Sequence, residues 1–410
     1  MTSDLLTVKL EKMTYGGDAL GRLSDGRAVF VPFALPGETV RIHSVDEKRG
    51  HMRAEMFENL EPSPDRIMPR CGHFGVCGGC HYQHIPYQVQ LTVKTDILRD
   101  QFMRIGKIDN LPMKQIVPSS CEWNYRNHIQ FHLTRQGKLG YIDAPGRGIL
   151  PITECHLPEQ PLSNLWPGLE FDSSLGLARI SLRLGMEEEI LLVLESEFPN
   201  IPELELEADL SVLHLVDNDV VVMAGNDHVL MIVNDRLFRV SAASFFQVNT
   251  KMAGKMVAHL LDSLPVSPMT TLLEVYCGVG LFSAFFAPRV GHLIGIESTP
   301  SACNDFAHNL DEFDNVDLFE ARAEDVLPAL EAKPDIVIVD PPRLGLEKCT
   351  LDALLGLGPV RIAYVSCDPS TLARDATRLL AGGYRLVQVT PFDLFPQTYH
   401  IESISILEKC

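Results

Sequence analysis

The chain has 410 residues, a formal net charge of −19 and a hydrophobic content of 46%. A chain of this length is expected to form two or three domains, and its apolar residues suffice to bury their cores. No run of about 18 apolar residues occurs, and the first residues, MTSDLLTVKL, lack the apolar core of a signal peptide. We therefore expect a cytoplasmic protein with no membrane-spanning segment.

The first predicted domain, residues 1–62, consists of short strands. Between residues 5 and 61, apolar and polar residues alternate with a period of two, and Gly16-Gly17, Asp25-Gly26 and Pro36-Gly37 interrupt the alternation. Several short strands in so few residues favour a small closed β-barrel of the kind whose loops bind oligonucleotides. An all-β accessory domain without such a role is the alternative.

The central region, residues 63–240, is predicted to be rich in strands. Residues 86–105 have the apolar spacing of a helix, and residues 120–240 contain five alternating segments that predict a mostly antiparallel arrangement. Within this region, residues 166–230 carry two Lys and Arg against fourteen Asp and Glu. We expect this acidic segment to be solvated and to face away from any polyanionic partner.

Residues 241–410 predict an α/β domain. Short apolar strands alternate with helical segments, which indicates a doubly wound, Rossmann-like parallel sheet with its ligand at the carboxyl ends of the strands. The predicted strands are TLLEVY, HLIGIE, VDLFEA, DIVIVD, IAYVSC and YRLVQV.

Three motifs at the ends of these strands indicate a nucleoside cofactor. Cys277-Gly278-Val279-Gly280 follows the first strand, Glu297 ends the second, and Asp340-Pro341-Pro342 ends the fourth. A dinucleotide fingerprint would have a third small residue where Ser283 stands. Together the glycine turn, an acidic residue placed for ribose hydroxyls and the Asp-Pro-Pro motif favour S-adenosylmethionine over NAD. A dehydrogenase-like or other nucleotide-binding domain is the alternative.

Cys367 and Glu402 are the candidate catalytic residues. Cys367 ends the strand IAYVSC at the cofactor edge, and Glu402 lies in the apolar segment HIESISIL. Uracil C5 is a poor nucleophile, and a thiolate that adds to C6 would make C5 enolate-like and able to attack a methyl sulfonium. A carboxylate could then remove the C5 proton. The alternatives are a packed thiol and a glutamate that faces solvent.

Cysteines near the N-terminus suggest a metal site. Cys71, Cys77 and Cys80 follow one another within ten residues among glycines, and Cys155 is a plausible distant fourth ligand. Reduced cytosolic thiols argue against disulfides. Four thiolates fit zinc or an iron–sulfur cluster, and the spacing alone leaves zinc as the default.

These motifs together resemble the RNA uracil-C5 methyltransferases that carry a TRAM domain and an iron–sulfur cluster. The resemblance covers nearly the whole chain, through the barrel, the cysteine loop, SFFQVN, EVYCGVGLFS, DPPR, SCDP and HIES. It implies that a 4Fe-4S cluster, rather than zinc, is bound by Cys71, Cys77, Cys80 and Cys155. It also implies a nucleophile, Cys367, a base, Glu402, and S-adenosylmethionine contacts from Gln247, Tyr276, Glu297 and Asp340.

Two details qualify the resemblance. Leu281 stands where some ribosomal members have asparagine, which puts a cofactor contact at this position in doubt. Phe245 and Phe246 could stack on a base, but we expect both to pack in the interior.

The expected function is methylation of C5 of a uridine in RNA by a monomer, with 23S ribosomal RNA favoured over transfer RNA. The uridine must leave its stack to reach Cys367. A radical enzyme is disfavoured because the first cysteine gap has five residues rather than three. A non-catalytic RNA-binding or assembly protein is disfavoured because Cys367, Glu402 and Asp340 are all present.

Overall fold

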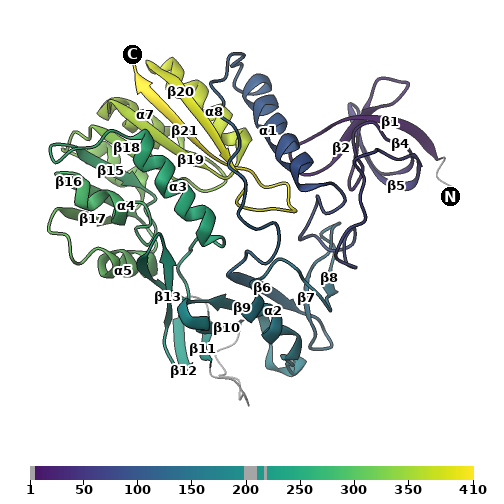
Figure 1. Ribbon diagram of the computed structural model, residues 1–410, viewed down its shortest axis with the longest axis horizontal. Coiled ribbons are helices and arrows are strands. Elements are labelled where there is room, and N and C mark those ends of the chain that lie inside the picture. Colours follow the sequence, from purple (N-terminus) through teal and green to yellow (C-terminus); the bar gives the residue numbers. More distant parts are fainter. Residues whose placement is uncertain (1–4, 198–209, 217–218) are drawn as a thin grey trace.

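The computed structural model describes residues 5–197, 210–216 and 219–410, arranged as an N-terminal barrel, a central sheet and a C-terminal sheet (Figure 1). The predicted acidic segment, residues 166–230, lies partly outside the described residues.

The N-terminal part is a closed barrel in the strand order β1-β2-β3-β5-β4, which confirms the predicted barrel. Side chains alternate between half-buried and buried positions along β3 and the first half of β4, as expected of a barrel with a filled interior. The strands are β1 (Leu6–Met13), β2 (Ala19–Arg22), β3 (Ala28–Val31), β4 (Thr39–Glu47) and β5 (His51–Glu61).

Helix α1 (Tyr87–Arg104) lies between the barrel and the C-terminal sheet (Figure 1). Its Ile97 is buried in the core of the barrel, whereas Leu98 and Phe102 are buried against one face of the C-terminal sheet. The helix therefore packs against two parts of the chain at once, and it confirms the helical spacing seen over residues 86–105.

The central part is a seven-stranded sheet in the order β12-β11-β10-β9-β6-β7-β8, followed by a separate two-stranded hairpin of β13 and β14. Neighbouring strands are antiparallel except for β10 and β11, which run parallel. The strands are β6 (His128–Leu133), β7 (Leu139–Ile142), β8 (Ile149–Pro151), β9 (Leu177–Leu184), β10 (Ile190–Ser196), β11 (Ser211–Val216), β12 (Asp219–Ala224), β13 (His228–Val233) and β14 (Arg236–Ser241).

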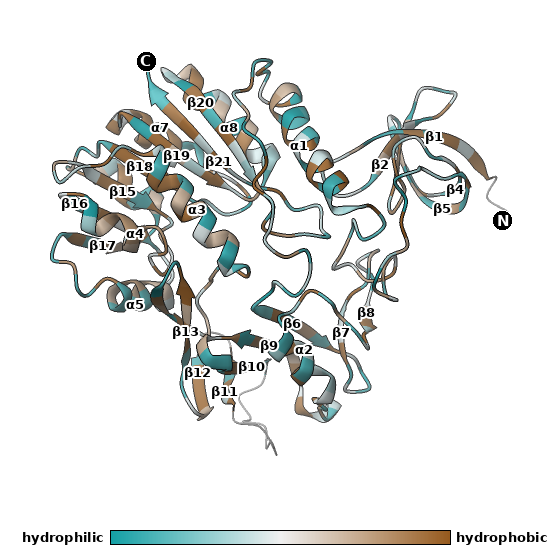
Figure 2. Cartoon of the chain, viewed as in Figure 1, coloured by the Kyte–Doolittle hydropathy of each residue, from teal (hydrophilic) through white to brown (hydrophobic). Residues whose placement is uncertain are grey.

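The C-terminal sheet has seven strands in the order β17-β16-β15-β18-β19-β21-β20. The inner strands β15 and β18 are apolar and almost wholly buried (Figure 2), as expected of strands that are covered on both faces. The strands of the sheet are β15 (Thr271–Val275), β16 (His292–Glu297), β17 (Val316–Glu320), β18 (Ile336–Val339), β19 (Arg361–Ser366), β20 (Tyr384–Phe392) and β21 (Glu402–Lys409).

One strand departs from the parallel sheet that the sequence predicted. β21 runs antiparallel to both β19 and β20, while the other pairs in the sheet are parallel. The expectation of a doubly wound sheet is confirmed, but the sheet is mixed. Because of this reversal, the first residue of β21, Glu402, lies beside the carboxyl end of β19.

The helices are α2 (Gln160–Leu165), α3 (Thr250–Ser263), α4 (Ser283–Phe286), α5 (Pro300–Asn309), α6 (Ala323–Val326), α7 (Lys348–Leu357) and α8 (Pro369–Ala381). Short 3-10 helices span Trp166–Gly168, Ser173–Leu175, Met186–Glu188, Ala287–Arg289 and Leu327–Ala329. None of the helices in the described ranges has the length and apolar character needed to cross a membrane.

Candidate active site

A pocket of about 1180 Å³ lies at the carboxyl ends of β15, β16, β18 and β19. In an α/β sheet this edge is the usual position of a ligand, because the connecting loops meet there. The pocket is lined by all six predicted catalytic and cofactor residues, Gln247, Tyr276, Glu297, Asp340, Cys367 and Glu402. Positions far apart in the sequence thus meet at one cavity.

The turn after β15 brings the backbone close to the pocket. Tyr276, Gly278 and Gly280 all have positive φ angles, of 64°, 54° and 86°. A Cβ atom at Gly280 would approach Leu310 Cδ1 to 2.5 Å, so glycine is needed both for the backbone conformation and for contact with the segment that follows α5. The turn therefore leaves its backbone accessible to a ligand.

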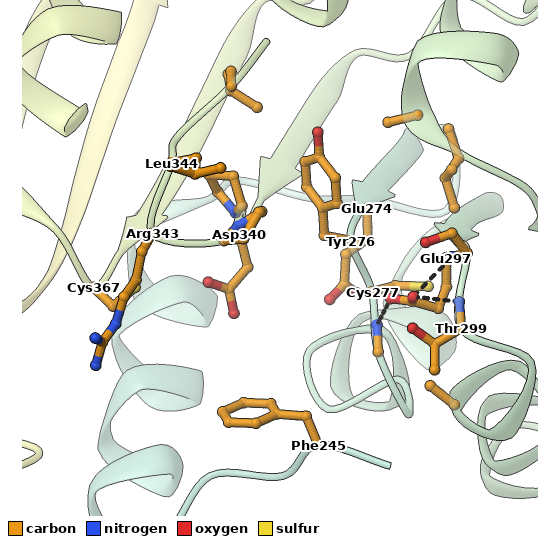
Figure 3. A pocket seen from close by; sticks show the side chains of 18 of the residues that line it. Phe245, Glu274, Tyr276, Cys277, Glu297, Thr299, Asp340, Arg343, Leu344 and Cys367 are labelled. Carbon is orange, nitrogen blue, oxygen red and sulfur yellow. Dashed lines mark hydrogen bonds between the residues drawn. The ribbon is translucent and has the colours of Figure 1, made fainter. Parts of the chain in front are cut away.

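Glu297 already accepts several hydrogen bonds from this edge of the sheet. Its Oε2 accepts from Gly278 N at 3.0 Å, and its Oε1 accepts from Ser298 N and Thr299 N, both at 2.8 Å (Figure 3). These amide groups fix the orientation of the carboxylate. They leave its remaining lone pairs for ribose hydroxyls, which donate hydrogen bonds to carboxylates.

Asp340 follows β18 and points into the pocket between Tyr276 and Arg343 (Figure 3). Burial raises the pKa of its carboxyl to about 7. Beneath it, Glu274 on β15 is only 1% exposed, and burial raises its pKa to about 8 although Ser283 donates a hydrogen bond to it. Two acidic groups that resist ionisation favour a cationic ligand at this position.

Cys367 and Glu402 lie at the same end of two paired strands. Ser366, the last residue of β19, is paired with Ser403 of β21, so the next residue of one strand lies beside the preceding residue of the other. Glu402 is 4% exposed, and burial, followed by the charge of Asp340, raises its pKa well above the usual value. Burial, followed by the charges of Glu402 and Asp340, raises the pKa of Cys367 to about 12.

Arg343 is the positive charge that faces this pair. Its guanidinium lowers the pKa of both Cys367 and Glu402, although burial outweighs it in each case. The sequence placed Arg343 in a motif without giving it a role. Its position directly after Asp-Pro-Pro could have suggested a role at the pocket. Arg126 and His400 also line the pocket, but nothing in the sequence around them indicates this.

Comparison with known proteins identifies the family of this chain. Residues 4–57 match the TRAM domain, and residues 218–410 match the tRNA (uracil-5-)-methyltransferase family. A protein of Halalkalibacterium halodurans named an uncharacterized RNA methyltransferase is 31% identical, over 99% of this chain and 97% of its own length. One of the same description from Aquifex aeolicus is 34% identical, over 98% of both chains. The chain belongs to the TRAM-containing RNA (uracil-5-)-methyltransferase family.

A solved structure shares the whole fold of this methyltransferase. The Pyrococcus abyssi tRNA (uracil-54, C5)-methyltransferase, solved with S-adenosyl-L-homocysteine, superposes with a TM-score of 0.77 at 24% identity, over 98% of this chain and 100% of that one. This likeness confirms the predicted three-part fold. The family matches confirm the expectation of an S-adenosylmethionine-dependent RNA uracil-C5 methyltransferase with an N-terminal TRAM barrel. The roles of its individual residues stay predictions.

The two phenylalanines before Gln247 behave differently. Phe246 is 5% exposed and packs against Phe238 with ring centroids 5.8 Å apart, as predicted. Phe245 is 71% exposed and lies at the pocket, so the prediction that it packs in the interior is wrong (Figure 3). Adjacent residues on an irregular segment point in opposite directions, and sequence alone did not show which of the two would be buried.

The four cysteines predicted to bind metal lie in one corner of the methyltransferase. The loop of Cys71, Cys77 and Cys80 docks on the central sheet, where Gly78 N donates to Ile142 O at 3.0 Å. Burial is the main cause of the raised pKa of all four thiols. The four also lie close enough to act on one another, because the charge of Cys155 raises the pKa of Cys71 and Cys80, and the charge of Cys77 raises that of Cys80 and Cys155. All four are free.

The donor chemistry of this corner fits a metal bound by thiolates, but its geometry is not that of a closed ligand set. Over residues 5–197, 210–216 and 219–410, no three His, Cys, Asp or Glu side chains are arranged to hold a metal ion. The structure thus supports the proximity of the cysteines and not the predicted 4Fe-4S cluster itself.

Proposed function

We propose that this methyltransferase acts on C5 of uridine through a covalent bond between Cys367 and C6 of the base. The observation that carries the proposal is the position of Cys367 and Glu402 at adjacent ends of β19 and β21, in the pocket that also contains Asp340. A soft nucleophile, a carboxylate and the cofactor edge of the sheet then meet around one base.

The reaction uses each group once. The Cys367 thiolate forms the S–C6 bond, and the electron pair of the C5–C6 double bond moves towards C5 and O4. Bound S-adenosylmethionine would supply an electrophilic methyl group, so that C5 gains its new bond as the methyl–sulfur bond breaks and S-adenosylhomocysteine leaves. The Glu402 carboxylate then takes the C5 proton, and the returning electron pair re-forms the double bond and releases the Cys367 thiolate.

The electrostatics of the free enzyme suit a reaction that begins only when substrate is bound. With a pKa of about 12, Cys367 holds its proton at neutral pH, and the adjacent Glu402 disfavours the thiolate further. The Arg343 guanidinium favours both anions and faces both. A raised pKa also makes Glu402 a stronger base for a weakly acidic C–H group once it has ionised.

Gln247, Tyr276, Glu297 and Asp340 are proposed to hold S-adenosylmethionine. Glu297 is oriented by backbone amides for the ribose hydroxyls, and Asp340 offers a carboxylate between the glycine turn and Cys367 (Figure 3). A cationic sulfonium at this point would offset the cost of ionising Asp340.

For the RNA substrate we propose 23S ribosomal RNA, with transfer RNA as the alternative. The alternative is favoured by the description of the matched family and by the name of the Pyrococcus abyssi enzyme, whose fold spans the same three parts. The barrel alone therefore does not distinguish the two RNAs. The target uridine must be extruded to enter the pocket in either case.

The deciding experiment supplies both RNAs to the enzyme. Unmodified 23S ribosomal RNA and transfer RNA are incubated separately with labelled S-adenosylmethionine, digested, and analysed for labelled nucleosides by mass spectrometry. Labelled 5-methyluridine from ribosomal RNA alone supports the proposal, and label from transfer RNA alone replaces it with the alternative. No label in either RNA, from protein that binds the cofactor, favours a binding module.

We further propose that Cys71, Cys77, Cys80 and Cys155 bind a 4Fe-4S cluster, with a four-cysteine zinc site as the fallback. Anaerobically purified protein should contain iron and sulfide and absorb broadly at roughly 400 nm. The variant Cys155→Ser should lose this absorption, while Cys410→Ser, which changes an exposed cysteine, should retain it. One zinc per chain would replace the cluster by the fallback, and protein without either metal would overturn both.

A further inference from the structure

A side chain of the TRAM barrel reaches the residue next to the proposed nucleophile. Tyr15 lies in the turn between β1 and β2, and its hydroxyl donates a hydrogen bond to Asp368 Oδ2 at 3.1 Å. The two residues are 353 positions apart in the sequence. The contact therefore joins the N-terminal barrel to the C-terminal part of the chain, one residue away from Cys367, which lines the pocket.

Asp368 is fixed at both of its carboxylate oxygens. Its Oδ1 accepts from Ser370 N at 2.9 Å and Thr371 N at 3.0 Å, which makes it the N-cap of α8. Its backbone N donates to Ser366 Oγ at 3.2 Å. Cys367 stands between Ser366 and Asp368, so the backbone that carries the thiol is fixed on both sides. The second oxygen of Asp368, Oδ2, accepts the hydrogen bond from Tyr15.

The same barrel turn also contacts the segment that leads to Glu402. Tyr15 and Tyr399 make an edge contact with ring centroids 5.6 Å apart, and Tyr399 in turn contacts His400 at 4.4 Å. Ile401, directly before Glu402, is 1% exposed and belongs to the buried core of the barrel. The barrel therefore borders both proposed catalytic residues, each through its neighbour in the chain.

The turn between β1 and β2 packs closely against His81. Gly17 has a φ of 93°, and a Cβ there would come within 3.1 Å of His81 Cβ. His81 contacts Tyr399 with ring centroids 4.6 Å apart. Burial, followed by the charge of Asp368, raises the pKa of Tyr15 well above its usual value, so its hydroxyl stays a hydrogen-bond donor at every working pH.

We propose that Tyr15 is a positioning residue for the methyl transfer, and that the barrel turn, residues 14–18, supports the active site through Asp368 as well as being part of an RNA-binding domain. The inference rests on the proposed roles of Cys367 and Glu402. A hydrogen bond to a carboxylate is stronger than one between neutral groups. Displacement of a reacting atom by about 1 Å can slow a reaction roughly a hundredfold, so loss of one anchor beside the thiol is expected to be measurable.

The test separates positioning from RNA affinity. Tyr15→Phe keeps the ring against Tyr399 and removes only the hydroxyl. Tyr82→Phe is the matched control, because Tyr82 is 0% exposed in the same core and its hydroxyl has no hydrogen-bond partner within the described residues. The substrate is RNA that carries 5-fluorouridine at the target position. Fluorine cannot leave C5 as a proton does, so the covalent protein–RNA complex persists after methyl transfer and can be counted.

We expect Tyr15→Phe to form this complex about tenfold more slowly than the unchanged enzyme at saturating RNA and cofactor, with RNA affinity altered less than about twofold. Tyr82→Phe should match the unchanged enzyme in both. An unaltered rate in Tyr15→Phe, or a loss confined to RNA affinity, would overturn the inference.

A second variant provides an independent measurement. Asp368→Asn retains a side chain that can cap α8 but lacks the second carboxylate oxygen. It should slow complex formation as Tyr15→Phe does, and the double variant should be no slower than the slower single variant. Additive losses would show that Tyr15 acts elsewhere. If the unchanged enzyme formed no complex while it methylated unsubstituted RNA, the proposed nucleophile would fail, and the inference with it.

Discussion

Cys367 and Glu402 make opposite demands on one wall of the pocket. In the proposed mechanism the thiol must lose a proton beside a carboxyl whose own charge opposes that loss, and Glu402 is buried while Cys367 is half-buried. The Arg343 guanidinium favours both anions. The pair is therefore suited to act in sequence, with the thiolate consumed in the C6 bond before Glu402 receives the C5 proton.

This sequence predicts an intermediate that a single substitution should trap. Glu402→Gln lacks the base, so the methylated adduct should keep its C5 proton and stay bound to Cys367. We expect turnover to fall at least about a hundredfold, and a covalent protein–RNA complex to accumulate on unsubstituted RNA, visible on a denaturing gel. Cys367→Ala is the control and should form none. A Glu402→Gln variant that turns over normally would remove Glu402 from the mechanism.

Asp340 predicts a pH dependence that distinguishes the cofactor from its product. Its folded pKa of about 7 lies above the usual carboxyl value, so below that pH the group is mostly neutral and must lose its proton to face a cation. S-adenosylmethionine carries a sulfonium charge, and S-adenosylhomocysteine does not. The ratio of their affinities should therefore shift towards S-adenosylmethionine by roughly threefold or more between about pH 6 and about pH 8.

Titration calorimetry of both ligands at several pH values measures this ratio. Titrating groups remote from the sulfonium affect the two ligands alike, and their effects cancel in the ratio. Glu274, whose pKa of about 8 also lies in this range, would not cancel, so the series is repeated in Glu274→Gln and Asp340→Asn is compared in that background. Asp340→Asn should weaken binding of S-adenosylmethionine and make the ratio independent of pH. Parallel pH curves in the unchanged enzyme would exclude contact between Asp340 and the sulfonium.

At the level of the elements, α1 holds the loop between β20 and β21 through a buried ion pair. Lys94 donates to Asp393 at 2.5 Å and to Phe395 O at 2.9 Å, and both Lys94 and Asp393 are 0% exposed. Further along the loop, Gln90 and Gln397 exchange two hydrogen bonds of 2.9 Å. The helix thereby fixes the segment that continues into Glu402.

Removal of one partner of this pair should cost far more than removal of both. Lys94→Met leaves the Asp393 charge buried without its counter-ion, and we expect unfolding in urea to require about 3–5 kcal/mol less free energy than in the unchanged protein. Lys94→Met combined with Asp393→Leu leaves no charge and should recover most of that loss. If the double variant were as unstable as the sum of the two single variants, Lys94 and Asp393 would not be coupled, and the buried ion pair would not explain the loss.

The elements of the C-terminal sheet were predictable because their signal is local. β18, Ile336–Val339, is buried along its whole length, as a strand covered on both faces must be, and its sequence IVIV shows this directly. The glycine turn and the residues at strand ends were likewise found from neighbouring positions. The reversed direction of β21 was not predictable, because an apolar strand has the same pattern in either direction.

Contacts between residues that are far apart in the sequence could not be predicted for a related reason. Lys94 and Asp393 are 299 positions apart, and each alone has the pattern of an ordinary surface charge. Tyr15 looks like a turn residue, and its partner Asp368 like a helix cap. Sequence patterns identify the element in which a side chain lies, but the tertiary fold decides which side chain it meets.

At the level of the whole molecule, the three parts share buried cores rather than meeting at separate surfaces. Leu191, Val193 and Leu213 of the central sheet are buried in the same cluster as residues of the C-terminal sheet. Ile401 is buried among residues of the barrel. Parts that share a core lose apolar contacts together when one of them opens, so we expect them to unfold as one unit.

Cofactor binding offers the means to test this coupling. The chain contains two tryptophans, Trp123 and Trp166, and both lie in the central region, away from the cofactor pocket. Their fluorescence reports the central region, whereas far-ultraviolet circular dichroism reports all three parts. In urea, both signals should change in a single transition at the same midpoint.

S-adenosylhomocysteine at about 100 times its Kd should stabilise the native state by roughly 2.7 kcal/mol. The proposed cofactor site is in the C-terminal part. The fluorescence midpoint, which reports the central region, therefore moves only if the central region unfolds together with the C-terminal part. We expect both midpoints to rise equally. If the ligand raised the midpoint measured by circular dichroism but not the one measured by fluorescence, the central sheet would unfold independently. The shared cores would then be too weak to couple its unfolding to that of the cofactor pocket.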